Sequence, residues 1–564
     1  MNNTIWKITD KISAKAQKAL ADYDEVTRQL LFSRGIITKK EAEDFFHPNY
    51  EDLPDPYSMK DMEKAVKRII RAIEKKERIV IYGDYDVDGI TSTALLYQGL
   101  LRLGADVKFY IPHRVKEGYG MNVASIDFLA EEGTRLIITV DNGISAHEEI
   151  EQAKKLGMDI VITDHHEITK DVPEAYAILN PKQKNDAYPF KDLCGVGVAF
   201  KLISALVIKT KKKDFSPDQL KWYLDLVALG TISDVMPLVG ENRALVHFGL
   251  IVLTQTKNIG LKALAKIGGI DLKKSSPYTI GFQIGPRLNA AGRMAHAETA
   301  LSLILADDIP TAEMLALRLE RLNSERQKTV KESLENLKAS FVEKKMTKAL
   351  VVGHKDWSAG IIGLIAGRMS EEFSRPVFCL SLDGDVFKGS VRSSINFSVI
   401  EALSATKECY IGYGGHFAAG GFSILPENFD IFQSKIISYA ENILQDEDMA
   451  KILMIDMEID GGEIGEELFT KIQKFAPFGQ GNREPVFASQ FKIKEAKAVG
   501  EDGKHLKLAL SSDSKNIYGI AFGLGDLASR LPFGTDVKIA YNISENIWGE
   551  RRRIEMKVKD IKIG

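Results

Sequence analysis

The sequence predicts an α/β protein in which a parallel sheet is joined by a long helix to a second α/β region, with a small OB-like β-barrel at the C-terminus. Three observations predict this fold class. From about residue 75 to 180, apolar strands rich in β-branched residues alternate with helical segments, which is typical of βαβ units. Residues 310–345 keep a 3.6-residue apolar period among dense charges, which suits a helix between two domains. Near residues 537–541 and 554–559 apolar and polar residues alternate strictly, as in half-buried antiparallel strands.

These patterns divide the 564 residues into five parts. The length allows several domains, at roughly 100–200 residues for each. From the pattern alone, the last part fits an accessory β-domain of another purpose as well as one that binds oligonucleotides. The expected parts are an N-terminal helical segment (1–70), a parallel-sheet domain (71–308), a connecting helix (309–346), a second α/β domain (347–448) and an OB-like nucleic-acid-binding domain (449–564).

The composition is that of an ordinary globular protein, with 45% hydrophobic and 27% charged residues and a net charge of −3. Net charge averages over all faces, so this value neither supports nor excludes a DNA partner. The three cysteines are far apart and form no CxxC pair, which argues for a reducing compartment and against structural zinc. The N-terminus lacks the apolar core of a signal peptide, and no run reaches the roughly 18 apolar residues of a membrane helix. We therefore expect a cytoplasmic protein with no membrane partner.

The rest of the chain is organised around the stretch at residues 79–91. There an apolar strand leads into Asp84, Asp86 and Asp88, at alternate positions before a glycine and a helix-compatible segment. If the extended conformation persists, the three carboxylates point to one side. Crowded carboxylates repel one another and raise one another's pKa, and a divalent cation held by oxygen ligands removes that objection. A solvated acidic turn or a helix cap is the alternative that this motif alone leaves open.

Two further strands end in residues of the same kind. One strand runs into Asp141, and another runs into His165 and His166. In open α/β sheets ligand sites lie beyond the carboxyl ends of the strands, so we expect these side chains to gather with the aspartates at 84–88. Asp234, which follows a helix, is a further candidate, although by itself its setting is typical of a cap or turn residue.

A cluster of carboxylates with one or two imidazoles suits Mn²⁺ or Mg²⁺ better than a thiolate-rich zinc site does. It holds more acids than one ion needs, and two ions about 3.5–4 Å apart can hold the attacking water and the leaving oxygen of a phosphoryl centre. Asp141 is expected to bridge the ions, and a spare histidine to steady developing charge or protonate the leaving group. The chain shows no serine nucleophile elbow, Walker A loop or kinase motif set. The residues therefore predict a two-metal phosphoester hydrolase.

Three loops combine small residues with basic side chains. Residues 285–294 include two arginines, and residues 388–394 and 412–421 surround Arg392 and His416 with glycine and serine. Exposed backbone N–H groups and guanidinium forks suit phosphate oxygens. Tight turns with surface arginines and a packed imidazole are the alternative that these loops leave open.

Together these motifs resemble the DHH phosphoesterase superfamily. Its four acidic motifs are similar to the sequences here at 83–89, 140–143, 164–166 and 233–238. The Gly-Gly-His loop around His416 looks like that of the companion DHHA1 domain. The Gly-Pro-Arg-Leu-Asn-Ala-Ala-Gly-Arg stretch, the long helix and the terminal β-domain narrow the resemblance to the RecJ family of bacterial single-strand-specific exonucleases, over residues 45–560. It implies a DHH domain at 71–308 and a DHHA1 domain at 347–448.

The resemblance also implies metal ligands. Related pyrophosphatases and small-substrate phosphodiesterases have a histidine where this chain has Tyr82, so one ion is left a ligand short and Asp84 is the predicted substitute. His166 would lie by the scissile phosphate, which makes His166 and Asp141 the predicted catalytic residues. By resemblance one ion is bound by Asp86 and Asp141, and the other by Asp88, Asp141, His165 and Asp234.

The implied activity is that of a single-stranded-DNA-specific 5′-to-3′ exonuclease which uses two Mn²⁺ or Mg²⁺ ions, releases mononucleotides and acts in DNA repair and recombination. The implied partners are single-stranded DNA, a single-strand-binding protein and a RecQ-type helicase, and a monomer is expected. By resemblance Arg114, Ser390 and Arg392 hold the 5′ phosphate end and His416 reaches the same cleft, while Arg287 and Asn289 are the other expected DNA contacts.

Two other interpretations stay open at this stage. A DHH phosphodiesterase for cyclic dinucleotides or very short oligonucleotides would share the metal cluster but would not need the β-domain. A non-catalytic DNA-binding scaffold arises when relatives of this fold lose their metal ligands, and nearly all of those ligands are intact here. Activity on long strands distinguishes the exonuclease from the small-substrate enzyme.

Overall fold

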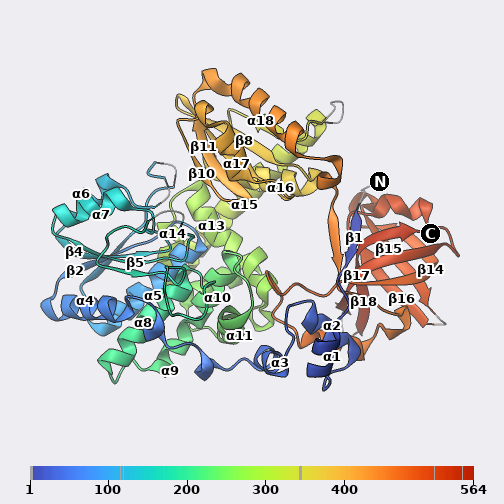
Figure 1. Cartoon of the computed structure of the whole chain (residues 1–564), viewed down its shortest axis with the longest axis horizontal. Helices are drawn as coiled ribbons and strands as arrows, with labels where there is room; N and C mark the ends of the chain where they lie inside the picture. The colour runs from blue at the N-terminus through green and yellow to red at the C-terminus, as the bar shows by residue number, and fades with distance from the viewer. Residues whose placement is uncertain are drawn as a thin grey trace. The chain divides into compact units, whose positions relative to one another are not determined.

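The computed structural model describes residues 4–114, 116–118, 120–168, 171–341, 346–512, 515–548 and 551–564. It consists of two compact units (Figure 1). The catalytic-side unit, as we call it from here on, comprises Tyr50–Met236 and Gly240–Met449. The barrel unit comprises Met1–Asn49, Pro237–Val239 and Ala450–Gly564.

The catalytic-side unit starts with a five-stranded sheet in the order β3-β2-β4-β5-β6, and every neighbouring pair is parallel. Helices connect β2 to β5 in succession, as parallel strands require. The parallel sheet predicted from the βαβ alternation is therefore confirmed. Its strands are β2 (Arg78–Tyr82), β3 (Val107–Tyr110), β4 (Thr134–Val140), β5 (Asp159–Thr163) and β6 (Ala177–Leu179).

Apolar side chains are buried on both faces of this sheet. Val80, Ile137 and Ile160 belong to the core under α6 and α7, while Ile79 and Ile81 are buried on the opposite face, where α4, α5 and α8 lie (Figure 1). Burial on both faces explains why the strands are near-continuous apolar runs rather than alternating ones. The helices are α4 (Met62–Lys75), α5 (Val87–Leu103), α6 (Val123–Glu131), α7 (His147–Lys155) and α8 (Gly195–Thr210).

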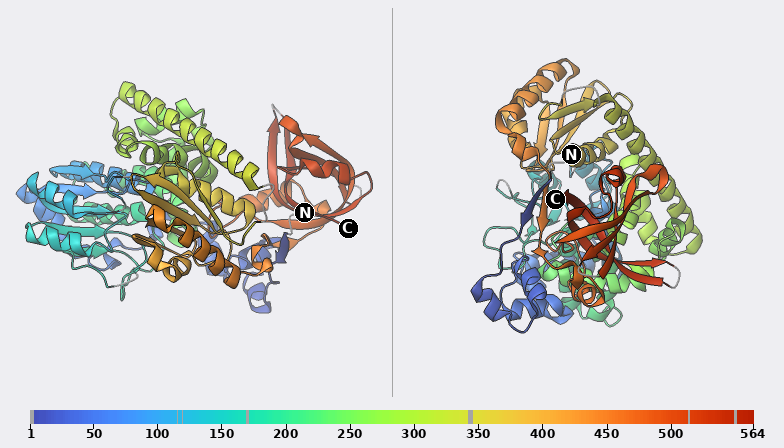
Figure 2. Two further views of the ribbon diagram at one scale, coloured as in Figure 1. Left: turned by 90° about the horizontal axis from the view of Figure 1, so that it is seen from above. Right: turned by 90° about the vertical axis from the view of Figure 1, so that its right-hand side faces the viewer.

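A helical region follows and ends in one long helix. The predicted helix at 310–345 is α15 (Ile309–Phe341), yellow-green in Figure 2, while residues 342–345 lie outside the described part of the chain. Among the described residues, no helix is both long and apolar enough to cross a membrane. The other helices here are α9 (Pro217–Leu220), α10 (Leu224–Ser233), α11 (Gly240–Thr254), α12 (Ile259–Gly268), the π-helix η5 (Thr279–Ile284), α13 (Gly285–Met294) and α14 (Glu298–Leu305).

The second α/β region has a mixed sheet in the order β10-β11-β9-β8-β7, in which only β7 and β8 are parallel. Val330 and Leu334 of α15 pack into the core formed by this sheet and α16, so the long helix is part of this region's packing. The elements are β7 (Leu350–Gly353), α16 (Ala359–Phe373), β8 (Val377–Asp383), β9 (Val386–Arg392), α17 (Val399–Ala405), β10 (Gly412–Gly415), β11 (Ala419–Ile424) and α18 (Phe429–Ile443).

The barrel unit contains a closed barrel, because β14 pairs with β17 as well as with β15. This confirms the predicted OB-like barrel. Inward-facing side chains such as Phe487, Leu508 and Tyr541 form its core. The strands are β14 (Phe487–Val499), β15 (His505–Ser512), β16 (Lys515–Ala521), β17 (Asp536–Trp548) and β18 (Arg551–Ile563), preceded by β12 (Ile452–Ile455), β13 (Met457–Glu458) and α19 (Glu466–Gln473).

The first residues of the chain belong to this same unit. Strand β1 (Ile5–Ile8) pairs in parallel with β12, and Trp6 Nε1 donates a hydrogen bond to Asp560 Oδ2 at 2.7 Å. The five-part division of the sequence stays a prediction. The structure differs from a purely helical segment at 1–70, since it has a strand there. Local periodicity did not predict this strand, because its partner is distant in the chain. The helices that follow are α1 (Ala14–Ala19), α2 (Glu25–Phe32) and α3 (Lys39–Phe46).

Arg34 ties this N-terminal segment to the residues before the barrel. Its Nε donates to Asn482 Oδ1 at 2.7 Å, its Nη2 donates to the Arg483 carbonyl at 2.6 Å, and its Nη1 lies 3.8 Å from Asp456 Oδ1. The Arg34 and Asp456 side chains are 5% and 2% exposed, so the ion pair is buried. Arg483 Nη2 lies 3.3 Å from the same Asp456 oxygen, so Arg34 is one of two cations beside this buried carboxylate.

We expect Arg34→Met to lower the free energy of unfolding of the barrel unit by about 1–3 kcal/mol, because the Asn482 side chain and the Arg483 carbonyl would lose their charged donor. Urea denaturation followed by circular dichroism measures the change. Lys39→Met is the matched control, since Lys39 pairs with Asp22 on the surface, at side-chain exposures of 60% and 64%, where solvent screens the pair and its loss should leave the free energy of unfolding nearly unchanged. Equal effects of the two substitutions would contradict the importance of the Arg34 contacts.

Candidate metal centre

Three neighbouring strands of the parallel sheet deliver the predicted residues to one edge. Strand β2 leads to Asp84, β4 to Asp141, and β5 to His165 and His166. Because the carboxyl ends of parallel strands meet at one edge, these side chains gather there. Asp141 has a φ of 61°, in the left-handed region where Asp is tolerated better than most residues, and this turns the chain sharply after β4.

The aspartate motif does not stay extended over its whole length. Asp86 is the N-cap of α5, and its Oδ1 accepts hydrogen bonds from the backbone N–H groups of Asp88 and Gly89 at 2.9 and 3.1 Å. The alternation that would point all three carboxylates to one side therefore ends at Asp86. Asp84 and Asp86 form one group with Asp141, and Asp88, in the first turn of α5, faces a second group.

The second group consists of Asp88, His165 and Asp234. His165 Nε2 lies 3.0 Å from Asp141 Oδ1, 3.5 Å from Asp234 Oδ2 and 3.8 Å from Asp88 Oδ2. One imidazole nitrogen therefore faces carboxylates of both groups. The structure brings all six predicted ligands together, and Asp141, which lies nearest to His165, connects the two groups.

The N-terminus of α8 fixes the Asp88 carboxylate. Asp88 Oδ2 accepts a hydrogen bond from the Gly195 N–H at 2.6 Å, and Oδ1 accepts one from the Val196 N–H at 2.8 Å. A Cβ at Gly195 would lie 2.7 Å from Asp141 Cβ, so only glycine permits this approach. Gly195 thus serves close packing beside the acidic cluster.

Burial and mutual repulsion raise the pKa of four carboxyl groups. Burial first, and then the charge of Asp86, raises the pKa of Asp88 to about 7. Burial and the charge of Asp88 raise the pKa of Asp234 to about 8. The pKa values of Asp84 and Asp141 lie well above the usual range, again through burial first and neighbouring aspartates second. Without a cation the cluster therefore retains protons, which a bound metal would displace.

The two histidines have opposite electrostatic settings. Burial and the charge of His166 lower the pKa of His165 to about 3, so this imidazole is neutral and suits a metal ligand. Burial alone would lower the pKa of His166, but the hydrogen bond from His166 Nδ1 to Asp164 Oδ1 at 2.7 Å and the Asp164 charge outweigh it and raise the pKa to about 9. His166 is thus kept as an imidazolium.

Asp164 was not among the predicted site residues, although it lies in the Asp-His-His motif. Burial would raise its pKa, but the hydrogen bond and charge of His166 prevail and lower the pKa to about 2. Asp164 also accepts backbone N–H bonds from Ile144, His165 and His166. A carboxylate fixed on so many donors orients the histidine pair, and the only sequence signal for it was its place before the two histidines.

Tyr82 is directed away from the acidic cluster. Its ring is part of the core under α6, and its hydroxyl lies 3.1 Å from Ser125 Oγ and 3.3 Å from the Gly120 carbonyl. Tyr82 therefore packs in the core, and the first group of candidate ligands contains Asp84 instead. Asp84 Oδ1 is buried and has no hydrogen-bond partner among the described residues.

The donor set fits divalent Mn²⁺ or Mg²⁺. In each group of three residues the candidate ligand atoms lie within 4.8 Å of one another, and they are carboxylate oxygens alone in the first group and carboxylate oxygens with one imidazole nitrogen in the second. Asp84 Oδ1 has no hydrogen-bond partner among the described residues, and the pKa of the Asp84 carboxyl group is raised. Both features are expected of carboxylates that are arranged to bind cations. The roles of individual ligands stay predictions.

A cavity of about 530 Å³ within the same unit brings together residues of both α/β regions. Tyr85, between Asp84 and Asp86, lines it with Arg114, and β9 contributes Ser390 and Arg392. The Arg114 guanidinium carbon lies 4.7 Å from the centroid of the Tyr85 ring. Three of the predicted DNA contacts therefore share one cavity.

Neither arginine of α13 lines this cavity, but the charges of Arg114 and Arg392, which do line it, act on Arg293. Burial first, and then the charges of Arg114 and other arginines, lower the pKa of Arg293 to about 9. Its Nη1 donates to the Gly360 carbonyl at 3.1 Å. Arg287, by contrast, pairs with Glu320 of α15 at 2.5 Å. Arg287 was the predicted DNA contact because both arginines lie in one stretch of sequence. Nothing local in that stretch shows which face of the helix each arginine occupies.

Asn289 and His416 lie apart from the residues that line this cavity. Asn289 is half-buried on α13, and His416 is exposed after β10, with its backbone N–H bonded to the Ala419 carbonyl at 2.7 Å. Ala419 and Gly420 do line the cavity, so the loop approaches it through its backbone. DNA contacts by Arg287, Asn289 and His416 stay predictions.

A parallel sheet with acidic and imidazole residues at three adjacent strand ends, facing a second α/β region across an arginine-lined cavity, defines a metal-dependent phosphoesterase. Family models agree with this class. The chain matches the DHH family, N-terminal domain, over residues 78–231, the DHHA1 domain over 343–442 and the RecJ OB domain over 455–560.

Full-length relatives narrow the class further. The single-stranded-DNA-specific exonuclease RecJ of Bacillus subtilis is 36% identical over 99% of this chain and 71% of its own length. The RecJ of Escherichia coli is 32% identical over 96% of each chain. The crystal structure of Thermus thermophilus RecJ in complex with Mn²⁺ has a TM-score of 0.86 and 31% identity, over 99% of this chain and 80% of that one. This chain belongs to the RecJ family.

The pKa shifts predict how metal binding depends on pH. Without metal, the folded protein retains protons on Asp88 and Asp234 that the unfolded chain, with ordinary carboxyl pKa values near 4, has released. The free energy of unfolding of the metal-free protein therefore falls as the pH rises from about 4 to about 8.

Mn²⁺ competes with those protons, so we expect a larger rise in melting temperature on adding Mn²⁺ at pH 8 than at pH 6. At a hundredfold excess over its dissociation constant the ion stabilises by about 2.7 kcal/mol. Differential scanning fluorimetry with EDTA and Mn²⁺ arms measures the shift, with NaCl of equal ionic strength as the control for screening. A rise in melting temperature that does not depend on pH would contradict the retention of protons by Asp88 and Asp234 in the metal-free protein.

Proposed function

We propose that this chain is a metal-dependent exonuclease specific for single-stranded DNA. The observation that carries the proposal is the carboxylate–imidazole cluster directly beside a cavity lined by guanidinium groups, with Tyr85 adjoining both. The curated relatives from B. subtilis and E. coli are named single-stranded-DNA-specific exonucleases. The family match extends through the OB domain, which a phosphodiesterase for small substrates would not need.

We assign the chemistry to the residues as follows. His166, held as an imidazolium by Asp164, is placed to donate a proton or a hydrogen bond to the leaving oxygen or to a phosphoryl oxygen. Two Mn²⁺ or Mg²⁺ ions, when bound, supply positive charge that activates water and neutralises developing negative charge. The residues that would hold them are Asp84, Asp86, Asp88, Asp141, His165 and Asp234.

The cavity suits the terminal phosphate of a strand. Arg114, Arg293 and Arg392 form no ion pair with a carboxylate among the described residues, and Arg392 Nη1 donates to Ser390 Oγ at 3.1 Å. Guanidinium groups that repel one another are stabilised by a phosphate dianion. We infer that the 5′ end binds here, as the family resemblance implies, so that hydrolysis proceeds from 5′ to 3′ and releases mononucleotides.

The outer surface of β16 and β18 suits the bases of a single strand. The Arg553 guanidinium carbon lies 4.3 Å from the centroid of the Tyr518 ring, and Lys557 Nζ lies 6.0 Å from that of Phe522, which is 57% exposed. Aromatic faces interleaved with cations bind single strands without sequence preference. We therefore assign the OB-like domain a DNA-holding role.

The wider biological assignments rest on the family. We propose a role in DNA repair and recombination, with a single-strand-binding protein and a RecQ-type helicase as partners. We also propose that the protein is a cytoplasmic monomer. Each is an extension of the RecJ resemblance rather than of a contact in this chain.

The proposal is tested with one long single strand labelled separately at its 5′ and 3′ ends and incubated with Mn²⁺, beside duplex and metal-free controls. We expect immediate release of the 5′ label as a mononucleotide, slow loss of the 3′ label and an intact duplex. Turnover of dinucleotides without cleavage of the long strand would instead place the chain among small-substrate phosphodiesterases.

Asp141→Ala should lower hydrolysis by about 10³-fold or more, because Asp141 connects the two groups of candidate ligands. The fold should persist, since the substitution removes a buried carboxyl group that its neighbours repel. Initial rates on single-stranded DNA and melting temperatures in EDTA measure the two effects. Near-normal activity in this variant would exclude Asp141 as a bridging ligand.

Arg293→Gln and Arg287→Gln form a matched pair on α13. We expect Arg293→Gln to weaken binding of a 5′-phosphorylated strand by about tenfold or more, since a charged hydrogen bond contributes about 1.5–3 kcal/mol. Arg287→Gln should leave binding within about twofold and mainly lower stability, because Arg287 pairs with Glu320. Fluorescence anisotropy with 5′-phosphate and 5′-hydroxyl strands compares them, and the reverse order of effects would support Arg287 as the DNA contact.

A further inference from the structure

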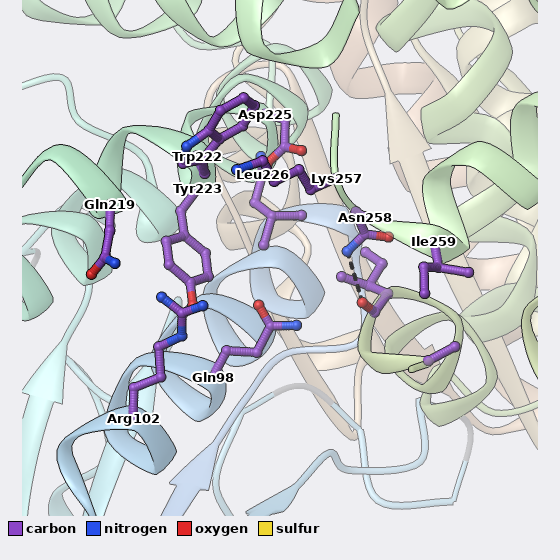
Figure 3. A pocket seen from close by; sticks show the side chains of 12 residues that line it. Gln98, Arg102, Gln219, Trp222, Tyr223, Asp225, Leu226, Lys257, Asn258 and Ile259 are labelled. Carbon is purple, nitrogen blue, oxygen red and sulfur yellow. Dashed lines mark hydrogen bonds between the residues drawn. The ribbon is translucent and has the colours of Figure 1, made fainter. Parts of the chain in front are cut away.

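A second crevice in the catalytic-side unit lies at the far ends of two helices that carry candidate metal ligands. It has a volume of about 320 Å³ and opens between α5, α10 and the start of α12 (Figure 3). Asp225, Leu226 and Ile304 form its buried floor. Both oxygens of Asp225 are engaged inside the protein, Oδ2 with Thr256 Oγ1 at 2.5 Å and Oδ1 with the Leu226 N–H at 2.7 Å.

The rim of the crevice carries two exposed cations, Arg102 and Lys257. Lys257 Nζ lies 3.7 Å from the centroid of a Trp222 ring, and the Arg102 guanidinium carbon lies 5.2 Å from that of Phe215. Neither cation forms an ion pair with a carboxylate in the part of the chain that the structure describes. Aromatic rings hold these two charges in place while leaving them open to an anion.

The wall of the crevice offers a flat apolar surface and an amide. Tyr223 lies beside Arg102, and the Gln98 side chain extends into the space below Leu226 (Figure 3). Asn258 is committed to the fold, donating to the Ile304 carbonyl at 2.8 Å and accepting from the Leu261 N–H. The Gln98 amide has no hydrogen bond to other described residues, so its donor and acceptor face the crevice.

We propose that this crevice binds a 5′-mononucleotide, with the phosphate at Arg102 and Lys257, the base against Tyr223 and Leu226, and Gln98 at the edge of the base. An anionic group joined to a flat ring with hydrogen-bonding edges matches the cations, the aromatic wall and the amide together. Mononucleotides are the product class of the proposed exonuclease, so the inference rests on that function.

The two helices connect the crevice to the metal centre. Gln98 and Arg102 lie on α5 about 15 and 21 Å along the helix from Asp88, at 1.5 Å per residue. Asp225 and Leu226 lie in the first turn of α10, which Asp234 caps at its other end. A Cβ at Gly230 of α10 would lie 2.6 Å from Asp88 Oδ1, so the helices meet without spare room beside the ligands.

A ligand wedged between α5 and α10 therefore changes the spacing of Asp88 and Asp234. Occupancy of the crevice should slow the chemical step without blocking the DNA cavity. The crevice thus acts as a product-sensing site, and the inhibition it produces lowers kcat and leaves KM unchanged.

The binding test is equilibrium dialysis of labelled deoxyadenosine 5′-monophosphate against the full-length protein with Mn²⁺. The wild type should show one class of binding site for this nucleotide, and Arg102→Gln combined with Lys257→Gln should lower the affinity of that class at least tenfold. The control, Lys328→Gln with Lys331→Gln, removes two exposed cations from α15 and should bind as the wild type does. Arg392→Gln, in the DNA cavity, should leave this class of site unchanged.

Unlabelled competitors separate the chemical sources of binding. If inorganic phosphate displaces the label as effectively as the mononucleotide does, the base contacts are excluded and the proposal fails. If deoxyadenosine alone displaces it equally well, the roles of Arg102 and Lys257 are excluded.

The kinetic test measures hydrolysis of long single-stranded DNA at rising mononucleotide concentration. For the wild type kcat should fall at least threefold with KM unchanged, while the Arg102/Lys257 variant keeps its kcat. Purely competitive inhibition, or equal inhibition of the two proteins, overturns the proposal and leaves the exonuclease function intact. Failure of the wild type to cleave DNA, with label binding that still needs Arg102 and Lys257, overturns the exonuclease function and the product-sensing role while the nucleotide site stands.

Discussion

Repulsion among buried carboxylates is the constraint on which the catalytic-side unit depends. Asp84, Asp88, Asp141 and Asp234 are packed at the ends of β2, β4 and α10 and in the first turn of α5, where burial and shared charge raise their pKa values. The parallel sheet makes this crowding possible, since adjacent strands deliver their next residues to one edge. Backbone N–H groups of α8 offset part of the charge on Asp88. The remaining imbalance is what divalent cations would neutralise.

Positively charged side chains are also crowded in and beside the neighbouring cavity. Burial and the charge of Arg114 lower the pKa values of Arg293 and Arg392, while burial and shared charge raise the pKa values in the acidic cluster nearby. No ion pair joins the two groups of like charges among the described residues, although Arg114 acts on Asp84 and Asp86 acts on Arg293. A phosphodiester strand with its counter-cations supplies both missing partners at once, and Tyr85 marks the boundary between the two groups. Substrate and metal ions together would therefore neutralise both groups of like charges.

Much of this architecture could be predicted from the sequence, because its signals are local. Strand periodicity and the acidic strand ends predicted the parallel sheet and brought Asp141, His165 and Asp88 to one edge. The cap formed by Asp86 was missed, since alternate spacing fits an extended chain as well as the first turn of a helix. Arg293 was missed for a similar reason: the orientation of a side chain on α13 depends on contacts with α15 and α16. Asp164 was part of a recognised motif, but its role appears only through its hydrogen bonds.

The pairing of β1 with β12 joins residues that are far apart in the chain, Ile5 opposite Ile452. During synthesis the N-terminal strand leaves the ribosome hundreds of residues before its partner exists, so it waits unpaired while the parallel-sheet region folds. Such non-local closure is slow, and an apolar strand edge exposed meanwhile can pair with other chains. The barrel unit is therefore the last part of the newly made protein to become complete, and its N-terminal strand has no partner strand until then.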